Sequence, residues 1–192
     1  MEEVKLYFEL GWEHIISWNA LDHILFIIAL CALYQVKNWK KVLLLVTAFT
    51  VGHSITLALS VYDIIRFNSN WVEFLIPCTI IATAAFNFLK KDNSPKTLWI
   101  NYFIALFFGL IHGMGFANSI RFMLLSDQKI ALPLLSFNIG LEAGQIVIVT
   151  LVLILSYLTI TLLKTPKKAW IFSLSIIAFA VALKMAIDRW PI

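Results

Sequence analysis

Long apolar runs dominate this chain, and they predict helices that cross a membrane. A helix needs roughly 20 apolar residues to span a bilayer. No run alternates apolar and polar residues with a period of two, so the pattern favours helices over a transmembrane β-barrel. The sequence therefore predicts an all-α, polytopic membrane helical bundle, folded as a single transmembrane domain over residues 1–192. Its six predicted spans are 20–36, 42–61, 72–89, 98–117, 131–163 and 169–187.

Two segments differ from a standard span. Residues 131–163 are longer than a bilayer requires, which predicts a helix that tilts or projects beyond the lipid. Residues 6–18 (LYFELGWEHIISW) are too short and too polar to cross on their own. We expect them to form an N-terminal amphipathic segment that packs at the membrane surface or is re-entrant.

Composition supports a membrane location. The chain is 61% hydrophobic, and 14% of its residues are charged, against about 25% in soluble domains. The two cysteines, Cys31 and Cys78, both lie inside apolar runs. They resemble small core residues and do not form a disulfide framework or a thiolate metal site.

The lysines predict the orientation. A net charge of +4 raises the question of nucleic-acid binding, but the basic residues cluster beside predicted spans, so we expect a lipid bilayer and no nucleic acid as the partner. The positive-inside rule places the loops that hold most of these basic residues in the cytoplasm. It places both termini outside, as in a multi-pass protein of the bacterial inner membrane. Nine of the 15 basic residues lie in the loops after the first, third and fifth spans: Lys37, Lys40, Lys41, Lys90, Lys91, Lys96, Lys164, Lys167 and Lys168.

Ionisable residues interrupt the apolar runs at one common depth. A charged group inside hydrocarbon costs at least a few kcal/mol, so each such residue needs a reason. With the predicted orientation, all of them fall in the outer half of the membrane. Independent placements would scatter over both halves, so the simpler interpretation is one shared polar site that faces outward. The residues at this depth are Asp22, His23, His53, Glu73, His112 and Glu142.

The chemistry of these groups suggests a transition-metal ion. Imidazole and carboxylate together suit Ni, Zn, Fe or Co better than Mg or Ca, and we expect Ni or Zn. The Gly109, Gly113 and Gly115 backbone would let helices approach closely around the site. The predicted metal ligands are His14, Asp22, His23, His53, His112 and Glu142. The predicted supporting residues are Thr56, Glu73, Asn138 and Gln145, with Thr50 and Thr56 flanking His53 at three residues on either side and able to fix its tautomer.

Simpler roles remain open for the same residues. His53 and His112 could be hydrogen-bonding links between helices, worth about 0.6 kcal/mol each. Asp22 could cap a helix. His14 and Glu73 could be solvated near the membrane surface, and Glu142 could pair with a histidine or with Gln145.

Five motifs in order resemble the HupE/UreJ family of hydrogenase- and urease-accessory membrane proteins. They are WEHIISWNALDHILFIIAL, TAFTVGHSITLAL, VEFLIP, FFGLIHGMGFAN and FNIGLEAGQ, and the resemblance covers about residues 10–190. It implies binding of nickel or a related divalent metal and secondary transport. His14, Asp22 and His23 correspond to the family's first-helix histidine and the Asp-His pair that follows it.

The chain departs from the family at this first motif. The family usually has five residues between the first histidine and the aspartate, whereas this chain has seven, Ile15–Leu21. Two extra residues would rotate a continuous helix by about 200°. Either the helix breaks near Trp18 and Asn19, or His14 does not have the family's role. A second departure is Phe86, which precedes Asn87 where the family often has an acidic residue.

Three functions fit these observations. The first is a metal permease of the nickel type with an outward-facing His/carboxylate site. The second is an intramembrane zinc-dependent hydrolase, in which three ligands leave a position for water. The third is an accessory protein that holds metal for a partner. The inner half carries few polar residues beyond Asn87 and Asn101, which counts against transport but not against binding. The sequence leaves open the metal, any substrate and whether the chain forms a homo-oligomer.

Overall fold

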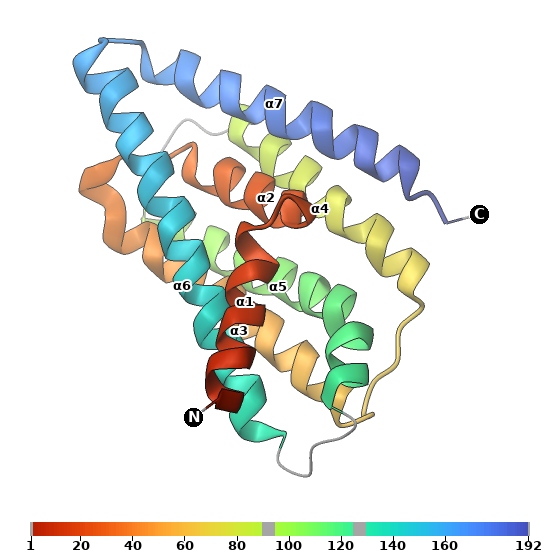
Figure 1. The fold of residues 1–192 in the computed structure, drawn as a ribbon. Coiled ribbons are helices and arrows are strands. Elements are labelled where there is room, and N and C mark those ends of the chain that lie inside the picture. The colour runs from red at the N-terminus through yellow and green to blue at the C-terminus, as the bar shows by residue number, and fades with distance from the viewer. Residues whose placement is uncertain (1, 90–94, 125–129, 192) are drawn as a thin grey trace.

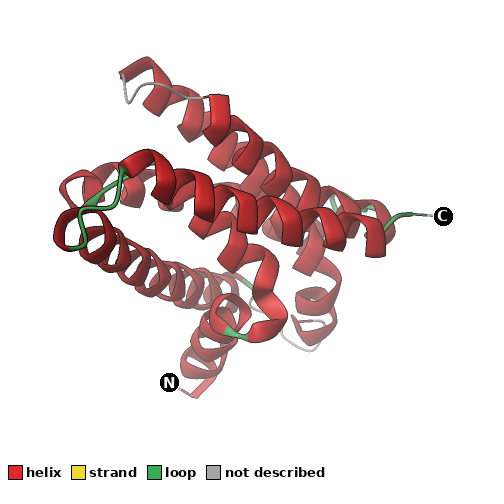
Figure 2. Ribbon diagram, turned by 90° about the horizontal axis from the view of Figure 1, so that it is seen from above, coloured by secondary structure: helices red, strands yellow, loops and turns green. Residues whose placement is uncertain are grey.

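The protein is helical along the whole of the described chain. The structure, a computed structural model, describes residues 2–89, 95–124 and 130–191, without the side chains of residues 19, 95–97 and 117–124. Figure 2 shows helices joined by short loops, with no strand among these residues. The elements are α1 Glu2–Ile16, η1 Trp18–Ala20, α2 Leu21–Cys31, η2 Val36–Asn38, α3 Trp39–Val61, α4 Ser69–Leu89, α5 Pro95–Leu124, α6 Ala131–Ser156, η3 Tyr157–Leu162 and α7 Lys167–Asp188.

The predicted membrane bundle is confirmed. Five helical stretches are long and apolar enough to cross a bilayer: Val36–Val61, Ser69–Leu89, Leu98–Phe116, Ala131–Leu162 and Lys167–Asp188. Their outward faces carry large apolar side chains such as Leu151 on α6 and Phe172 on α7. Water would penalise such a surface, whereas lipid tails accept it.

The long fifth span is also confirmed. It runs over 32 residues, Ala131–Leu162, which corresponds to about 48 Å at 1.5 Å per residue. Its last turns, Tyr157–Leu162, are a π-helix. The span therefore exceeds the roughly 30 Å thickness of the hydrocarbon core.

The first span differs from the prediction. Residues 20–36 do not form one helix, because α2 has 11 residues and ends at Cys31, and 11 residues reach about 16 Å. Instead, α1 and α2 together are long and apolar enough to cross a bilayer. They are bent by 66° relative to each other at the short η1 helix, as in a broken span or a re-entrant pair. The segment 6–18 is thus mostly part of α1. Its exposed Glu9 and Glu13 lower the hydropathy on which the first prediction relied.

Glycines bring the helix backbones into direct contact. A Cβ on Gly11 would overlap the carbonyl of Phe137 on α6, and one on Gly140 would overlap the carbonyl of Phe8 on α1. The predicted close approach around Gly109 is confirmed in the same way, because a Cβ there would overlap the carbonyl of Phe49 on α3. Small residues allow this packing where lipid supplies no hydrophobic driving force.

Six of the eight lysines whose side chains are described lie at one end of the bundle. Figure 1 shows the α2–α3 connection and the η3–α7 turn at its upper left, and the α3–α4 connection and the C-terminus at the opposite side. We call the first the lysine end, defined by Lys37, Lys40, Lys41, Lys164, Lys167 and Lys168. Two other basic residues used in the orientation prediction, Lys90 and Lys91, lie outside the described residues, and the side chain of Lys96 is not described.

The α1–α6 contact gives a stability prediction. Gly140→Ala places a methyl group against the backbone of α1, which cannot yield, and we expect a loss of about 1–3 kcal/mol. Gly144→Ala is the matched control one turn away, because its Cβ would meet side-chain atoms of Ile15 at 3.2 Å. Thermal unfolding in detergent should show a clear fall in Tm for Gly140→Ala and a smaller one for Gly144→Ala. Equal Tm values for the two variants would contradict the backbone contact.

Candidate metal centre

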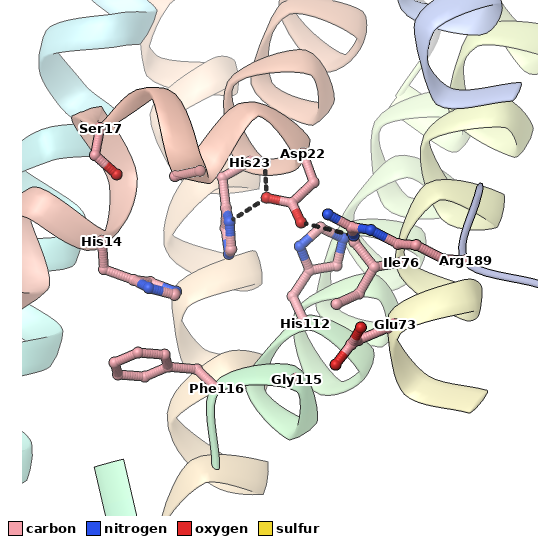
Figure 3. Close-up of a pocket in the computed structure, with 11 residues that line it drawn as sticks. His14, Ser17, Asp22, His23, Glu73, Ile76, His112, Gly115, Phe116 and Arg189 are labelled. Atoms are coloured by element: carbon pink, nitrogen blue, oxygen red, sulfur yellow. Dashed lines mark hydrogen bonds and ion pairs between the residues drawn. The ribbon is translucent and has the colours of Figure 1, made fainter. Parts of the chain in front are cut away.

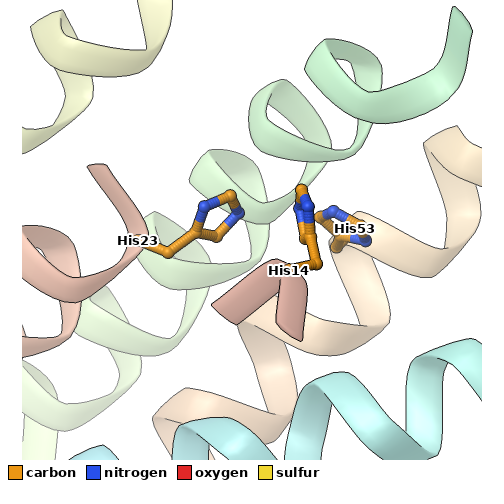
Figure 4. Close-up of side chains that lie close together, drawn as sticks. All are labelled: His14, His23 and His53. Carbon is orange, nitrogen blue, oxygen red and sulfur yellow. The ribbon is translucent and has the colours of Figure 1, made fainter. Parts of the chain in front are cut away.

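All four histidines of the chain meet in the interior of the bundle. His14 comes from α1, His23 from α2, His53 from α3 and His112 from α5. The ring centroid of His23 lies 4.8 Å from that of His14 and 4.9 Å from that of His112. One ring nitrogen each of His14, His23 and His53 lie within 4.8 Å of one another, and Figure 4 shows these three rings side by side. We call the four residues the histidine cluster.

The break between α1 and α2 makes this cluster possible. A continuous helix with seven residues between His14 and Asp22 would turn His14 away from the Asp-His pair. The 66° bend at η1 removes this difficulty, and the rings of His14 and His23 meet edge to face. Of the two alternatives left by the sequence, the helix break is confirmed.

Asp22 fixes the ring of His23. The Oδ1 atom of Asp22 accepts a hydrogen bond from the backbone N–H of His23 at 2.9 Å and lies 3.0 Å from His23 Nδ1. A carboxylate accepts but does not donate, so Nδ1 carries the hydrogen and Nε2 keeps its lone pair. A histidine held by a carboxylate in this way is common among metal ligands.

Thr79 does the same for His112. The Thr79 hydroxyl donates to the carbonyl of Ile76 at 2.7 Å, and its oxygen lies 3.1 Å from His112 Nε2. Because the hydroxyl hydrogen is already used, Nε2–H of His112 donates to Thr79, and Nδ1 keeps the lone pair. His112 is 1% exposed and His53 is fully buried.

Five of the six remaining ring nitrogens are buried and have no hydrogen-bond partner in the described structure. A buried polar atom left unpartnered costs about 1–3 kcal/mol. Neutral imidazole nitrogens with free lone pairs are also what a transition metal binds. The unpartnered atoms are His14 Nε2, His23 Nε2, His53 Nδ1, His53 Nε2 and His112 Nδ1. The donor set therefore fits a metal ion.

The cluster is wider than a loaded site. Tetrahedral coordination at about 2.0–2.1 Å places ligand nitrogens roughly 3.4 Å apart. The nitrogens of His14, His23 and His53 are separated by up to 4.8 Å. Binding therefore requires the rings to move inward by about an ångström, which side-chain rotation supplies.

A pocket of about 250 Å³ opens beside the cluster. Figure 3 shows His14, His23 and His112 on its wall, with Glu73 and Arg189 nearby. Arg189 Nη1 lies 3.3 Å from Asp22 Oδ2, so Asp22 joins the histidine cluster to the C-terminal end of α7. The remaining lining residues are Ser17, Ala20, Asp22, Ile76, Gly115 and Phe116.

Several predicted residues lie elsewhere. Glu142, a predicted ligand, accepts a hydrogen bond from Thr47 at 2.6 Å, and Gln145 accepts one from Thr50 at 2.7 Å. Both pairs link α3 to α6, and neither acidic nor amide group is among the pocket residues. Asn138 donates to the carbonyl of Leu134 in its own helix.

The expected support of His53 by threonine is not what the structure shows. Thr56 bonds to the carbonyls of Gly52 and His53, and Thr50 bonds to Gln145 and to a backbone carbonyl, so neither holds the His53 ring. Glu73, the fourth predicted supporting residue, does line the pocket. Its Oε1 lies 3.4 Å from the Ser69 hydroxyl.

Sequence reasoning missed Thr79 and Arg189. Thr79 begins a run of polar residues at four-residue steps, Thr79, Thr83 and Asn87, inside an apolar span, and this spacing marks one helix face. Arg189 follows the last span directly, at the same predicted depth as Asp22. Both signals are present in the sequence.

Comparison with known proteins places the chain in a family. Neither the curated proteins nor the solved structures compared with it gave a match. A family model described as HupE / UreJ protein matches residues 1–190. Because this match spans nearly the whole chain, and the chain carries membrane-spanning helices around a histidine cluster, the protein belongs to the HupE/UreJ family.

Proposed function

We propose that this protein binds a divalent transition-metal ion at the histidine cluster and carries it across the membrane. The observation that supports this function best is the set of unpartnered, buried imidazole nitrogens on four different helices. If the histidines only linked helices, these nitrogens would be hydrogen-bonded to other side chains. A metal ion would satisfy several of them at once.

The ligands we propose are His14, His23, His53 and His112, with Asp22 holding His23. A site of three or four imidazoles suits Ni²⁺ or Zn²⁺, and it does not suit Mg²⁺ or Ca²⁺, which prefer oxygen. The resemblance to nickel-handling members of the family favours Ni²⁺ between these two.

The pocket gives the ion a way to reach the cluster. With the lysine end in the cytoplasm, as the positive-inside rule predicts, the pocket side of the cluster faces outward. Two carboxylates, Asp22 and Glu73, line it with one cation, Arg189. The excess of negative charge attracts a metal cation and opposes an anion.

The broken helix favours carriage over permanent binding. Many transporters place their substrate where a spanning helix is interrupted, because the two halves can then move separately. Here the break lies between two proposed ligands, His14 on α1 and His23 on α2. A shift of α1 relative to α2 would open or close the ligand set.

A second candidate is an intramembrane zinc-dependent hydrolase. The pocket of about 250 Å³ is much larger than a metal ion and would leave room for a substrate and a metal-bound water beside the cluster. Arg189 and Glu73 would then face the substrate. Metal-dependent hydrolysis by the purified protein without metal movement across a membrane would select this candidate.

The first test is metal content. We expect purified protein loaded with Ni²⁺ or Zn²⁺ to hold near-stoichiometric metal, and His53→Ala and His112→Ala to lose at least roughly tenfold in affinity, because a ligand contributes more than the supporting groups, whose loss costs about 10–100-fold. Glu142→Gln is the control, because Glu142 bonds to Thr47 outside the cluster, and we expect it to keep the metal. Mass spectrometry of metal content and isothermal titration measure both.

Reconstitution of the same preparations tests carriage. Wild-type protein in lipid vesicles that contain a metal-sensitive dye should admit the ion, and His112→Ala should not. Metal retention by all the histidine variants would refute the proposed site. Binding without uptake by the wild type would refute the permease function and leave the hydrolase or a metal-holding accessory role.

Asp22 gives a separate prediction. Asp22→Asn removes the charge that orients His23 and pairs with Arg189. Loss of a carboxylate behind a ligating histidine typically costs about 10–100-fold in metal affinity. We expect a drop in this range by isothermal titration, with Tm changed little because the amide keeps the same shape. An unchanged affinity would show that His23 is not a ligand or needs no orientation.

A further inference from the structure

We propose that the ion passes from the histidine cluster to the lysine end through a layer of three phenylalanines into a second cavity between α2, α4 and α5. This inference rests on the proposed permease function and adds its route. It also addresses the shortage of polar residues in the inner half of the sequence, which counted against transport.

The phenylalanine layer follows from one repeated spacing. On each of three helices, a phenylalanine lies one turn away from a cluster histidine, on the side toward the lysine end. The pairs are His23 and Phe26 on α2, His53 and Phe49 on α3, and His112 and Phe108 on α5. Residues three or four apart share a helix face, so the three phenylalanines lie directly beneath the cluster.

Contacts between the rings show that the layer is continuous. The centroid of Phe26 lies 4.9 Å from that of Phe49 and 5.9 Å from that of Phe108. Phe49 and Phe26 also contact His112, at 5.0 and 5.7 Å. Phe26 and Phe49 are each 1% exposed. These rings therefore close the floor of the metal site with apolar surface.

A cavity of about 140 Å³ lies beyond this layer. It is lined by Leu30, Leu33, Ala82, Thr83, Phe86, Asn101, Ile104 and Phe108. Phe108 therefore belongs both to the layer and to the cavity wall. The volume is enough for roughly four waters at about 30 Å³ each, so an ion could enter with part of its hydration shell. Thr83 and Asn101 supply the polar side chains of the wall.

Polar groups on α4 connect the two sites. Thr79 contacts His112 in the cluster at 3.1 Å, and Thr83, one turn further, donates to the Thr79 carbonyl and lines the cavity. Asn87, another turn on, donates to the Ala29 carbonyl and to Ser175. The face of α4 is thus polar past the level at which the other three helices present phenylalanine.

This arrangement has the features of a gated route. An apolar constriction excludes water and ions until a side chain moves. Phe108 is the ring best placed to move, because it is partly exposed and borders the cavity, whereas Phe26 and Phe49 are packed on all sides. Rotation of Phe108 would join the histidine cluster to the cavity.

The test compares two neighbouring phenylalanines. Phe108→Ala removes the ring between cluster and cavity, and we expect a several-fold rise in Ni²⁺ uptake by reconstituted vesicles, with Ni²⁺ affinity at the cluster unchanged. Phe107→Ala is the matched control, because Phe107 is the adjacent residue on α5 and its side chain is 57% exposed at the surface of the bundle. We expect its uptake to equal that of the wild type.

A second variant tests the cavity itself. Thr83→Phe fills it, and we expect a several-fold loss of uptake with Ni²⁺ affinity retained, which also shows that the variant is folded. If the wild type carries Ni²⁺ and Thr83→Phe carries it equally well, the route is wrong while the permease function stands. If Phe108→Ala does not fold, Thr83→Phe decides alone. If the wild type binds Ni²⁺ and carries none, the permease function fails and the route fails with it.

Discussion

The structure depends on the cost of burying histidines without partners. In a bilayer interior, water is not at hand to satisfy an imidazole, and each unpartnered nitrogen lowers the stability of the fold. Here five such nitrogens belong to four neighbouring rings on four helices. Groups held apart would each need their own partner. Groups held together can share one cation, and this requirement explains why four helices meet where they do.

Backbone contacts hold two pairs of helices together, α3 against α5 and α1 against α6. The glycines of α3 and α5 bring Phe49 and Gly109 into contact close to His53 and His112, and Gly11 and Gly140 hold α1 against α6 close to His14. Asp22 and Thr79 each hold one ring nitrogen of a histidine, His23 and His112, and leave the other nitrogen with a free lone pair. Rigid helices thus carry the ligands, and the 66° break at η1 separates two of them, His14 on α1 and His23 on α2.

Sequence reasoning predicted the bundle and the proximity of three histidines, because both follow from simple penalties. Apolar runs must span lipid, and ionisable residues at one depth must share a site, which is how His23, His53 and His112 were grouped. Depth along a helix does not say which face a residue occupies, and Glu142, at the same predicted depth, accepts a hydrogen bond from Thr47. Sequence reasoning misplaced the first span, because the exposed glutamates of α1 hide its buried face. Partners such as Thr79 come from packing between helices, which spacing within one helix does not specify.

The most direct measurement is X-ray absorption spectroscopy of the Ni²⁺-loaded protein, because it counts the imidazoles around the metal. We expect a nitrogen-rich shell with the multiple-scattering signature of at least three histidines, reduced by one in His53→Ala and in His112→Ala. A shell of oxygens without imidazole scattering, or protein that holds no metal, would contradict this expectation.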